Sequence, residues 1–436
     1  MTGTLDITPA LPPPDRRGAF RLLFFALLAI GAGNTMLISA VLPPLTRDLG
    51  MPDWMAGAIF SFSALCWSLG SPFWGKKSNE WGRRRVAGIG LAGYAVSMAL
   101  VAVSAALALG GAIHGAVVIF ISLALSRSVF GLVGSASTPA AQAYVADRTS
   151  EAERTEEIAS VTSGFSVGTV VGPAFAAALV GGFSILSPRF GLISPVIVTM
   201  LLAATMSVLL FTQLPENRSP KADARKVHEE TEGARGLWRA GHVAPFLVYA
   251  VALSVVTGVL TQTFLFAVMD KMDVSGAQAV QYTGPAFTLG AVGVLLSQLV
   301  LIPRLQYSAR TLMIVGAVPM VIGALMIIPA GSGAYAILVF AQFLIGLGQG
   351  LVRPGFSSGA SLAVSPALQG NVAGLVISAN GLGYVVTPFF GLYVYEFVAP
   401  WVPFAFSAGL LAMMSVFAAV ALKPADEAQP PDAPST

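Results

Sequence analysis

The apolar residues of this chain come in runs of roughly 20 or more, and nearly all of these runs lack Asp, Glu, Lys and Arg. A helix rises about 1.5 Å per residue, so about 20 residues cross a hydrocarbon core of about 30 Å. Strands of a membrane barrel would be shorter and would alternate in polarity. Only 10% of the 436 residues are charged, too few to cover a soluble surface. The runs therefore predict an all-α membrane protein.

The same runs give the number of spans. Two of them, 86–126 and 311–352, are too long for one helix, and glycines at 110–111 and 331–333 divide each into a helical hairpin. We therefore predict twelve transmembrane helices, at residues 20–43, 54–75, 86–108, 114–136, 158–182, 190–212, 243–269, 278–303, 311–330, 334–353, 371–394 and 399–422.

Positive charge is distributed unequally between alternate loops. Of the 24 Lys and Arg residues, Arg47, Arg189 and Lys271 fall on one side, Arg127 lies within a span, and the remaining twenty fall on the other side. Loops rich in Lys and Arg stay in the cytoplasm. We therefore expect a multi-pass protein of the inner (plasma) membrane with both termini in the cytoplasm.

The chain divides into two halves that repeat each other. A constant offset of 215 residues relates Gly131 to Gly346, Pro139 to Pro354, Gly168 to Gly383 and Pro173 to Pro388. Two similar bundles can rock about a site near the middle of the bilayer. We predict a disordered tail at 1–18, a six-helix bundle at 19–213, a charged cytoplasmic linker at 214–241, a second pseudo-symmetric six-helix bundle at 242–423 and a disordered tail at 424–436.

The fifth span carries glycines at four-residue spacing, Gly164, Gly168 and Gly172, followed by Pro173. This spacing puts the glycines on one helix face, where another backbone can approach closely, and the proline weakens the helix just beyond them. Ordinary helix packing would explain any two of the glycines, and all three with Gly-Pro indicate a more specific role.

Three segments resemble motifs of the major facilitator superfamily. The glycine run of the fifth span resembles motif C, the signature of the antiporter families, and Arg127-x3-Gly131 with Pro139 resembles motif B. The segment WGKKSNEWGRRR resembles motif A, with Gly75, Gly82, Arg83 and Arg84 at motif positions. The resemblance extends over the whole chain and implies a drug:proton antiporter of the efflux type with the major facilitator fold.

The resemblance also implies contacts between the halves. In the superfamily the fifth and eighth helices meet, which makes Gly290 and Gly293 expected counterparts of the fifth-span glycines. The motif A loop, residues 75–85, is expected to pack against the cytoplasmic end of the eleventh span. This chain departs from motif A at Asn79 and Glu80, where the family has Asp and then Arg. In the family this acid caps a neighbouring helix and pairs with a basic residue to hold the outward-facing state. Asn79 can still cap a helix but cannot supply the charge.

Arg127 is an ionised residue deep in a span, where a charge costs about 2.5 to 3.5 kcal/mol on insertion scales and usually marks a pathway. Asn34 lies at similar depth in the first span, so we predict that the two residues lie close together in a substrate site. A purely structural role, bonding the carbonyls of a neighbouring helix, is the alternative for Arg127. Further candidate substrate-binding residues, each equally able to bridge helices, are Gln262, Gln342, Gln349 and Asn380.

No Asp or Glu lies at the middle of a predicted span, although a proton-coupled antiporter needs a group whose pKa can be shifted. Coupling must then use a carboxylate at the membrane rim, a charged substrate, or nothing. We expect efflux of a small amphipathic molecule by proton antiport. The alternative is an importer or facilitator of a small organic anion bound by Arg127.

Other classes of function find little support. One cysteine and three scattered histidines exclude a disulfide framework and offer no metal site. No catalytic pair is evident, so we expect no enzyme and no cofactor. The expected partners are the substrate, the lipid bilayer and coupling protons, with no nucleic acid, and we expect a monomer.

Overall fold

The computed structural model describes residues 16–149, 151–185, 187–215, 236, 240–331, 334–364 and 369–422, and these residues form helices joined by turns and short loops. The helices of the N-terminal half are α1 (Arg16–Met36), η1 (Leu37–Val41), α2 (Leu42–Asp48), α3 (Asp53–Trp81), α4 (Arg83–Leu109), α5 (Ala116–Leu132), η2 (Gly134–Ala136), α6 (Ser137–Ala146), α7 (Glu151–Ser184) and α8 (Pro188–Gln213). Those of the C-terminal half are α10 (Ala244–Met272), α11 (Gly276–Leu296), η3 (Ser297–Leu301), α12 (Ile302–Leu305), α13 (Ala309–Ile327), α14 (Tyr335–Leu362), α15 (Gln369–Phe397) and α16 (Val402–Ala421).

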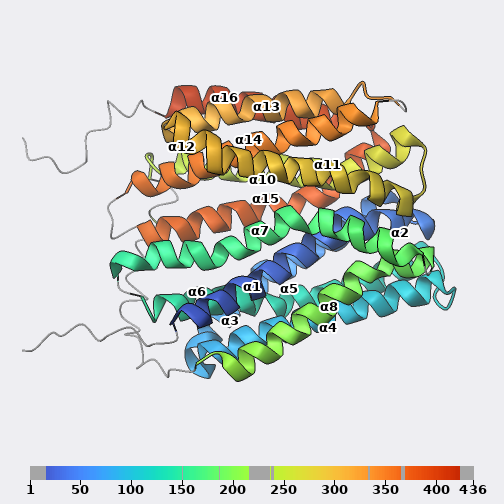
Figure 1. Ribbon diagram of the computed structural model, residues 1–436, viewed down its shortest axis with the longest axis horizontal. Helices are drawn as coiled ribbons and strands as arrows, with labels where there is room; N and C mark the ends of the chain where they lie inside the picture. The colour runs from blue at the N-terminus through green and yellow to red at the C-terminus, as the bar shows by residue number, and fades with distance from the viewer. Residues whose placement is uncertain are drawn as a thin grey trace, which may run out of the picture.

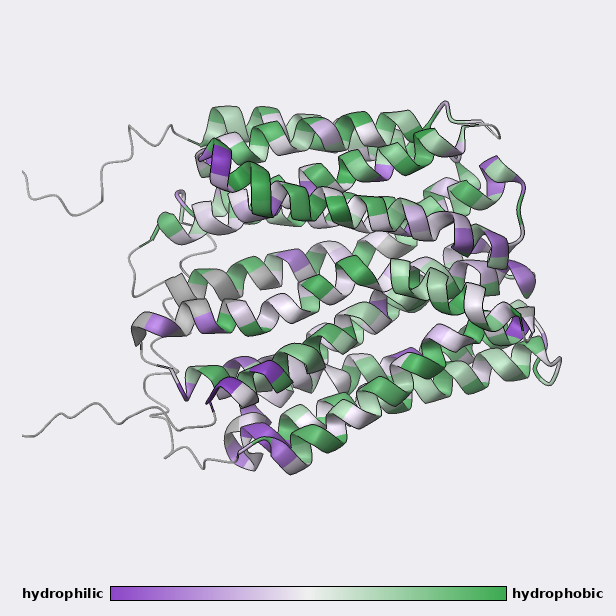
Figure 2. Cartoon of the chain, viewed as in Figure 1, coloured by the Kyte–Doolittle hydropathy of each residue, from purple (hydrophilic) through white to green (hydrophobic). Residues whose placement is uncertain are grey.

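Eleven helical segments of the described chain are long and apolar enough to cross a membrane, and α15 is the twelfth long helix of the bundle. A helix satisfies its own backbone hydrogen bonds, which is why helices can span hydrocarbon. Figure 2 shows the apolar residues along the middle of the helices and the most hydrophilic ones gathered towards the two ends. The predicted fold class, an all-α membrane protein of twelve helices, is confirmed.

Three spans contain an irregular turn, and each turn precedes a proline. The π-turns η1 and η3 lie before Pro43 and Pro303, and the 3-10 turn η2 lies before Pro139. Proline has no N–H, and its ring clashes with the carbonyl group four residues earlier. In each case that earlier residue lies inside the irregular turn, so the turn absorbs the clash while the span continues.

Some boundaries differ from the prediction. Helix α1 already begins at Arg16, so residues 16–18 belong to the helix rather than to a tail. Helix α3 continues to Trp81, so most of the expected motif A loop is helical. The turn to α4 consists of Gly82 alone, whose φ of 90° favours glycine. Residues 1–15, nearly all of the predicted linker and 423–436 lie outside the described residues.

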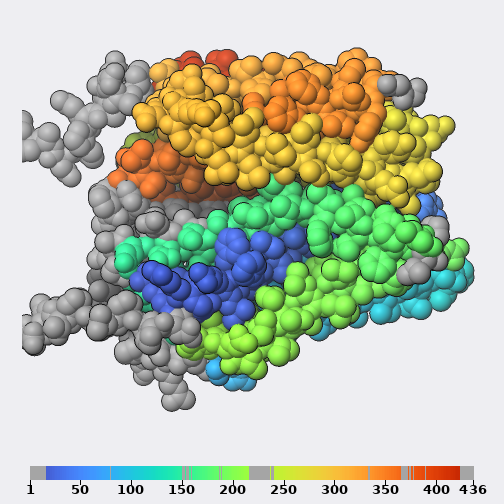
Figure 3. Space-filling view, viewed as in Figure 1, coloured from blue at the N-terminus to red at the C-terminus, as the bar shows by residue number. Residues whose placement is uncertain are grey.

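The helices run side by side along one axis, with the N-terminal half below the C-terminal half in Figures 1 and 3. Helix α1 begins and α16 ends on the left, at the end that also holds Arg83 and that we call the basic end. The opposite end, where α2 finishes, holds Arg47, Asp270 and Glu396, and we call it the acidic end. Helix α1 thus begins at the same end of the bundle at which α16 finishes. The prediction that both termini lie on one side of the membrane requires this arrangement.

The most extensive contacts between the described parts of the two halves form two seams, α3 against α15 and α7 against α11. In the first seam the Phe389 N–H donates to Ser61 Oγ at 3.2 Å. Eight residues further along α3, Leu69 is exposed, and eight residues back along α15 the Cβ position of Gly381 has no atom within 4 Å. This seam is therefore joined towards the acidic end and separated towards the basic end.

The second seam behaves in the same way. Gly284 of α11 lies directly against the Ala177 side chain of α7, so close that an added Cβ would clash. Ten residues closer to the basic end, Val167 of α7 is exposed, as is Leu295 on the facing stretch of α11. The two halves are thus in contact at the acidic end and splay apart towards the basic end.

Candidate functional site

Arg127 and Asn34 meet inside the N-terminal half, as predicted from their similar depth. Arg127 Nη2 on α5 donates to Asn34 Oδ1 on α1 at 2.7 Å. The Arg127 side chain is buried, with 1% of its surface exposed. Its Nε and Nη1 have no hydrogen-bond partner within the part of the chain that the structure describes. A buried cation with open donors favours an approaching anionic or polar group.

Aromatic rings cover the rest of the guanidinium group. Its Cζ lies 4.5 Å from the ring centroid of Phe130 and 5.3 Å from that of Phe60. Phe130 in turn packs against Tyr94 at 4.8 Å and Trp67 at 5.0 Å. Contacts between a desolvated cation and ring faces are worth about 2 kcal/mol or more each, so the two rings offset a large part of the cost of burial. The sequence offered no signal that would select Phe60 or Tyr94.

The backbone around Arg127 is fixed by close packing of α5 on α3. Gly131 lies one turn after Arg127, and a Cβ at this position would clash with Cys66 and the Ser63 carbonyl oxygen of α3. The Ser63 hydroxyl donates to the Arg127 carbonyl oxygen at 3.1 Å. The spacing Arg127-x3-Gly131 therefore has a physical reason, because the glycine admits α3 on the helix that carries the arginine.

The C-terminal candidates form a separate, uncharged group. Asn380 Oδ1 on α15 accepts a hydrogen bond from Ser254 of α10 at 2.8 Å. Gln262 and Gln342 are buried, and Gln349 is half-buried. Among the described residues, no hydrogen bond joins any of these four side chains to Arg127 or Asn34. Of the six predicted substrate-binding residues, the structure therefore brings two into contact with each other, Arg127 and Asn34.

The glycine face of α7 packs against α1, within the same half. A Cβ at Gly164 would clash with the carbonyl oxygen of Phe24, and one at Gly168 with that of Leu28. A Cβ at Gly172 would clash with the Thr35 hydroxyl. The expectation that these glycines admit the eighth span is therefore wrong. The three glycines instead hold α7 on the helix that carries Asn34, and Pro173 beside them is buried.

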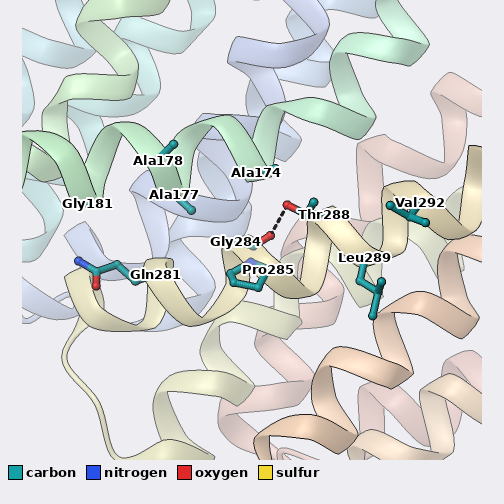
Figure 4. Close-up of a pocket in the computed structure, with 10 residues that line it drawn as sticks. All are labelled: Ala174, Ala177, Ala178, Gly181, Gln281, Gly284, Pro285, Thr288, Leu289 and Val292. Atoms are coloured by element: carbon teal, nitrogen blue, oxygen red, sulfur yellow. Dashed lines mark hydrogen bonds between the residues drawn. The ribbon is translucent and has the colours of Figure 1, made fainter.

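The contact between α7 and α11 uses other small residues. Ala177 meets Gly284, whereas Gly290 and Gly293 face α14. Beside this contact lies a groove of about 630 Å³, which Figure 4 shows between α7 and α11. Thr288 Oγ1 donates to the Gly284 carbonyl oxygen on the α11 side of the groove. Its lining residues are Ala174, Ala177, Ala178, Gly181, Gln281, Gly284, Pro285, Thr288, Leu289 and Val292.

The motif A arginines lie at the basic end. Arg83 Nε donates to Asp147 at 3.1 Å, and its Nη1 donates to Ser78 at 3.1 Å. These bonds stay within the N-terminal half. Arg84 follows it in the first turn of α4, and the Cβ position of Gly75 faces open space. The Asn79 side chain lies outside the described residues. Because α3 and α15 are separated towards the basic end, the predicted packing of this segment on the eleventh span is not made by the described residues in this arrangement and stays a prediction for the opposite one.

Comparison with known proteins gives one consistent result. The family model described as Major Facilitator Superfamily matches residues 23–306 and 286–436. Multidrug resistance protein 2 of Bacillus subtilis is 24% identical over 385 residues, 86% of this chain and 87% of that protein. Tetracycline resistance protein, class B, of Escherichia coli is 24% identical over 402 residues, 87% of this chain and 88% of that protein. The solved structure of a D-xylose-proton symporter has a TM-score of 0.70 at 15% identity, covering 92% of this chain and 96% of that one.

Proposed function

The chain belongs to the major facilitator superfamily, and on that basis we propose that it exports a small amphipathic molecule across the inner membrane by alternating access and proton antiport. The superfamily consists of transporters, and the relatives named for multidrug and tetracycline resistance support the export direction. The observation that carries the proposal is the buried Arg127, bonded to Asn34 and with two nitrogens open.

Arg127 gives the site its chemical preference. A substrate group that carries a negative charge or lone pairs can complete the hydrogen bonds of the guanidinium, and Phe60 and Phe130 provide apolar surface beside it. This combination suits an amphipathic molecule with one polar or anionic end. Because Arg127 is almost fully buried, a substrate reaches it only if neighbouring side chains move.

The basic end is assigned to the cytoplasm, since Lys and Arg favour that side. With the halves joined at the acidic end and separated at the basic end, the molecule is then in an inward-facing arrangement. An exporter loads its substrate in this arrangement, so the cytoplasmic compound would approach between the splayed seams.

The second candidate, import or facilitated movement of a small organic anion, is favoured by the same site. Within the described residues Arg127 has no carboxylate partner, so the anion itself would supply the missing charge. In that case transport would need no proton, consistent with the absence of an acid at mid-membrane.

Transport by the purified protein in liposomes separates these two candidates. Vesicles with an acidic interior and a trapped pH-sensitive dye are given tetracycline, ethidium or salicylate from outside. For proton antiport we expect uptake of an amphipathic compound together with a protein-dependent rise of the interior pH. Salicylate uptake with no dye response would support the organic anion transporter instead. If tetracycline and ethidium were taken up at the same rate with and without the pH gradient, proton antiport would be excluded.

A further inference from the structure

A cluster of ionised residues joins the two halves at the acidic end. Arg47, at the end of α2, donates from Nη1 to Asp270 Oδ1 at 2.5 Å and from Nη2 to Asp53 Oδ2 at 2.7 Å. Asp53 begins α3 in the same half as Arg47, whereas Asp270 lies near the end of α10 in the other half. One arginine thus holds one carboxylate of its own half and one of the opposite half.

Two residues near the end of α15 strengthen the junction. The Tyr395 hydroxyl donates to Asp270 Oδ2 at 2.6 Å and so orients that carboxylate towards Arg47. Glu396 Oε2 accepts the Trp54 N–H at 2.9 Å. This N–H lies in the first turn of α3, where backbone donors have no partner inside the helix and a negative charge is favourable. The C-terminal half therefore caps a helix of the N-terminal half.

The neighbouring cation does not compete for Asp270. Lys271 Nζ donates to the carbonyl oxygens of Ile328 and Ala330, at 3.0 and 2.9 Å, beyond the end of α13. Separation of the halves would therefore leave Asp270 without a hydrogen-bonded cation, with Lys271 acting on it only through its charge, while Arg47 would keep Asp53. The electrostatic cost of opening therefore falls mainly on Asp270, which loses a bonded partner, and less on Arg47, which keeps one.

We propose that Arg47, Asp270, Tyr395 and Glu396 form a clasp that holds the acidic end closed, and that Arg47 acts as the positioning residue whose release from Asp270 sets the balance between the two arrangements of the halves. Asp53 has the opposite influence, because it competes for Arg47 and remains its partner after opening. The proposal rests on the alternating access of the proposed function, but its test requires no transported compound.

The test compares Asp270→Asn with Asp53→Asn. Each variant removes one of the two carboxylates of Arg47, so they serve as a matched pair. Spin labels in a Cys66→Ser background report the acidic end through His114→Cys with Val398→Cys, and the basic end through Arg17→Cys with Tyr307→Cys, all at exposed positions. Distances are measured by electron–electron double resonance in lipid nanodiscs.

For Asp270→Asn we expect the acidic-end-open population to rise about fivefold, with shorter distances at the basic end, because the charge of a partly exposed ion pair is lost and the bond from Tyr395 to a neutral oxygen is weaker. Asp53→Asn should leave that population unchanged or lower it. Asp270→Glu, which keeps the charge, should restore the original distribution. Tyr395→Phe should have a smaller effect in the same direction as Asp270→Asn.

The proposal is overturned if Asp270→Asn leaves both distance distributions unchanged, or if the two Asn variants shift them equally. A structural defect would broaden the distances at both ends rather than lengthen one and shorten the other. Failure of the proposed function has a different signature, since the clasp variants would shift the distances as expected while no compound is transported by the parent protein.

Discussion

The two halves place different residues at equivalent positions of their fourth and tenth spans. Arg127 of α5 and Gln342 of α14 are related by the 215-residue offset, and both are buried. The glycine one turn later is the same in both halves. Gly131 admits α3 onto α5, and Gly346 admits α11 onto α14. The packing is duplicated and the charge is not, so the repeat preserves the scaffold while the site chemistry belongs to one half.

The largest expected effect comes from making the halves alike. Arg127→Gln gives the N-terminal half the residue that the C-terminal half already accommodates at this position, so we expect the fold to persist. Transport should fall about 30-fold or more, since removing one partner of a buried, charged hydrogen bond costs about 2 kcal/mol at least. Initial transport rates in liposomes and the thermal unfolding midpoint measure the two consequences separately.

Arg127→Lys is the control for charge without the planar fork of guanidinium donors. We expect it to retain part of the activity if the role of Arg127 is electrostatic. Normal transport by Arg127→Gln would make the difference between the halves irrelevant to function, and a large fall in the unfolding midpoint would assign Arg127 a structural role.

The sequence predicted this architecture because its signals can be read from the position of residues along the chain. Apolar runs identify the spans, and the offset of Gly131 and Gly346 identifies the repeat. Similar depth along two spans was enough to pair Arg127 with Asn34. The partner of a glycine face cannot be read in the same way, because Gly168 shows only that some backbone comes close. The sequence also did not predict the cluster around Arg47, because Arg47 and its partner Asp270 are 223 positions apart in the chain.

An intermediate effect is expected from the glycine face of α7, which has a partial counterpart in α15. Gly168→Leu would push against the backbone of α1, and Gly383→Leu would push against Val251 and Ser254 of α10. Overpacking of this kind costs about 1 to 3 kcal/mol. We expect both variants to lower the thermal unfolding midpoint in detergent by similar amounts, as the repeat implies.

Gly182→Leu is the matched control on α7, because its Cβ position has no atom within 4 Å. It should leave the unfolding midpoint close to that of the parent protein. If Gly168→Leu were as stable as Gly182→Leu, the close approach of α7 and α1 would have no energetic importance, and the glycine spacing would need another explanation.

The smallest effect should come from the uncharged pair of the C-terminal half. Asn380 accepts from Ser254, but the Ser254 hydroxyl also reaches the Ala250 carbonyl oxygen at 2.9 Å, so it keeps a partner when Asn380 is removed. Hydrogen bonds between helices in membranes average about 0.6 kcal/mol. Asn380→Ala should therefore change the unfolding midpoint and the transport rate little.

Asn34→Ala removes the hydrogen-bond partner of a buried cation and should reduce transport several-fold more. Rates for both variants, measured in one liposome preparation, test whether function depends on the half that carries the charge, and equal losses would show that the two polar pairs contribute alike.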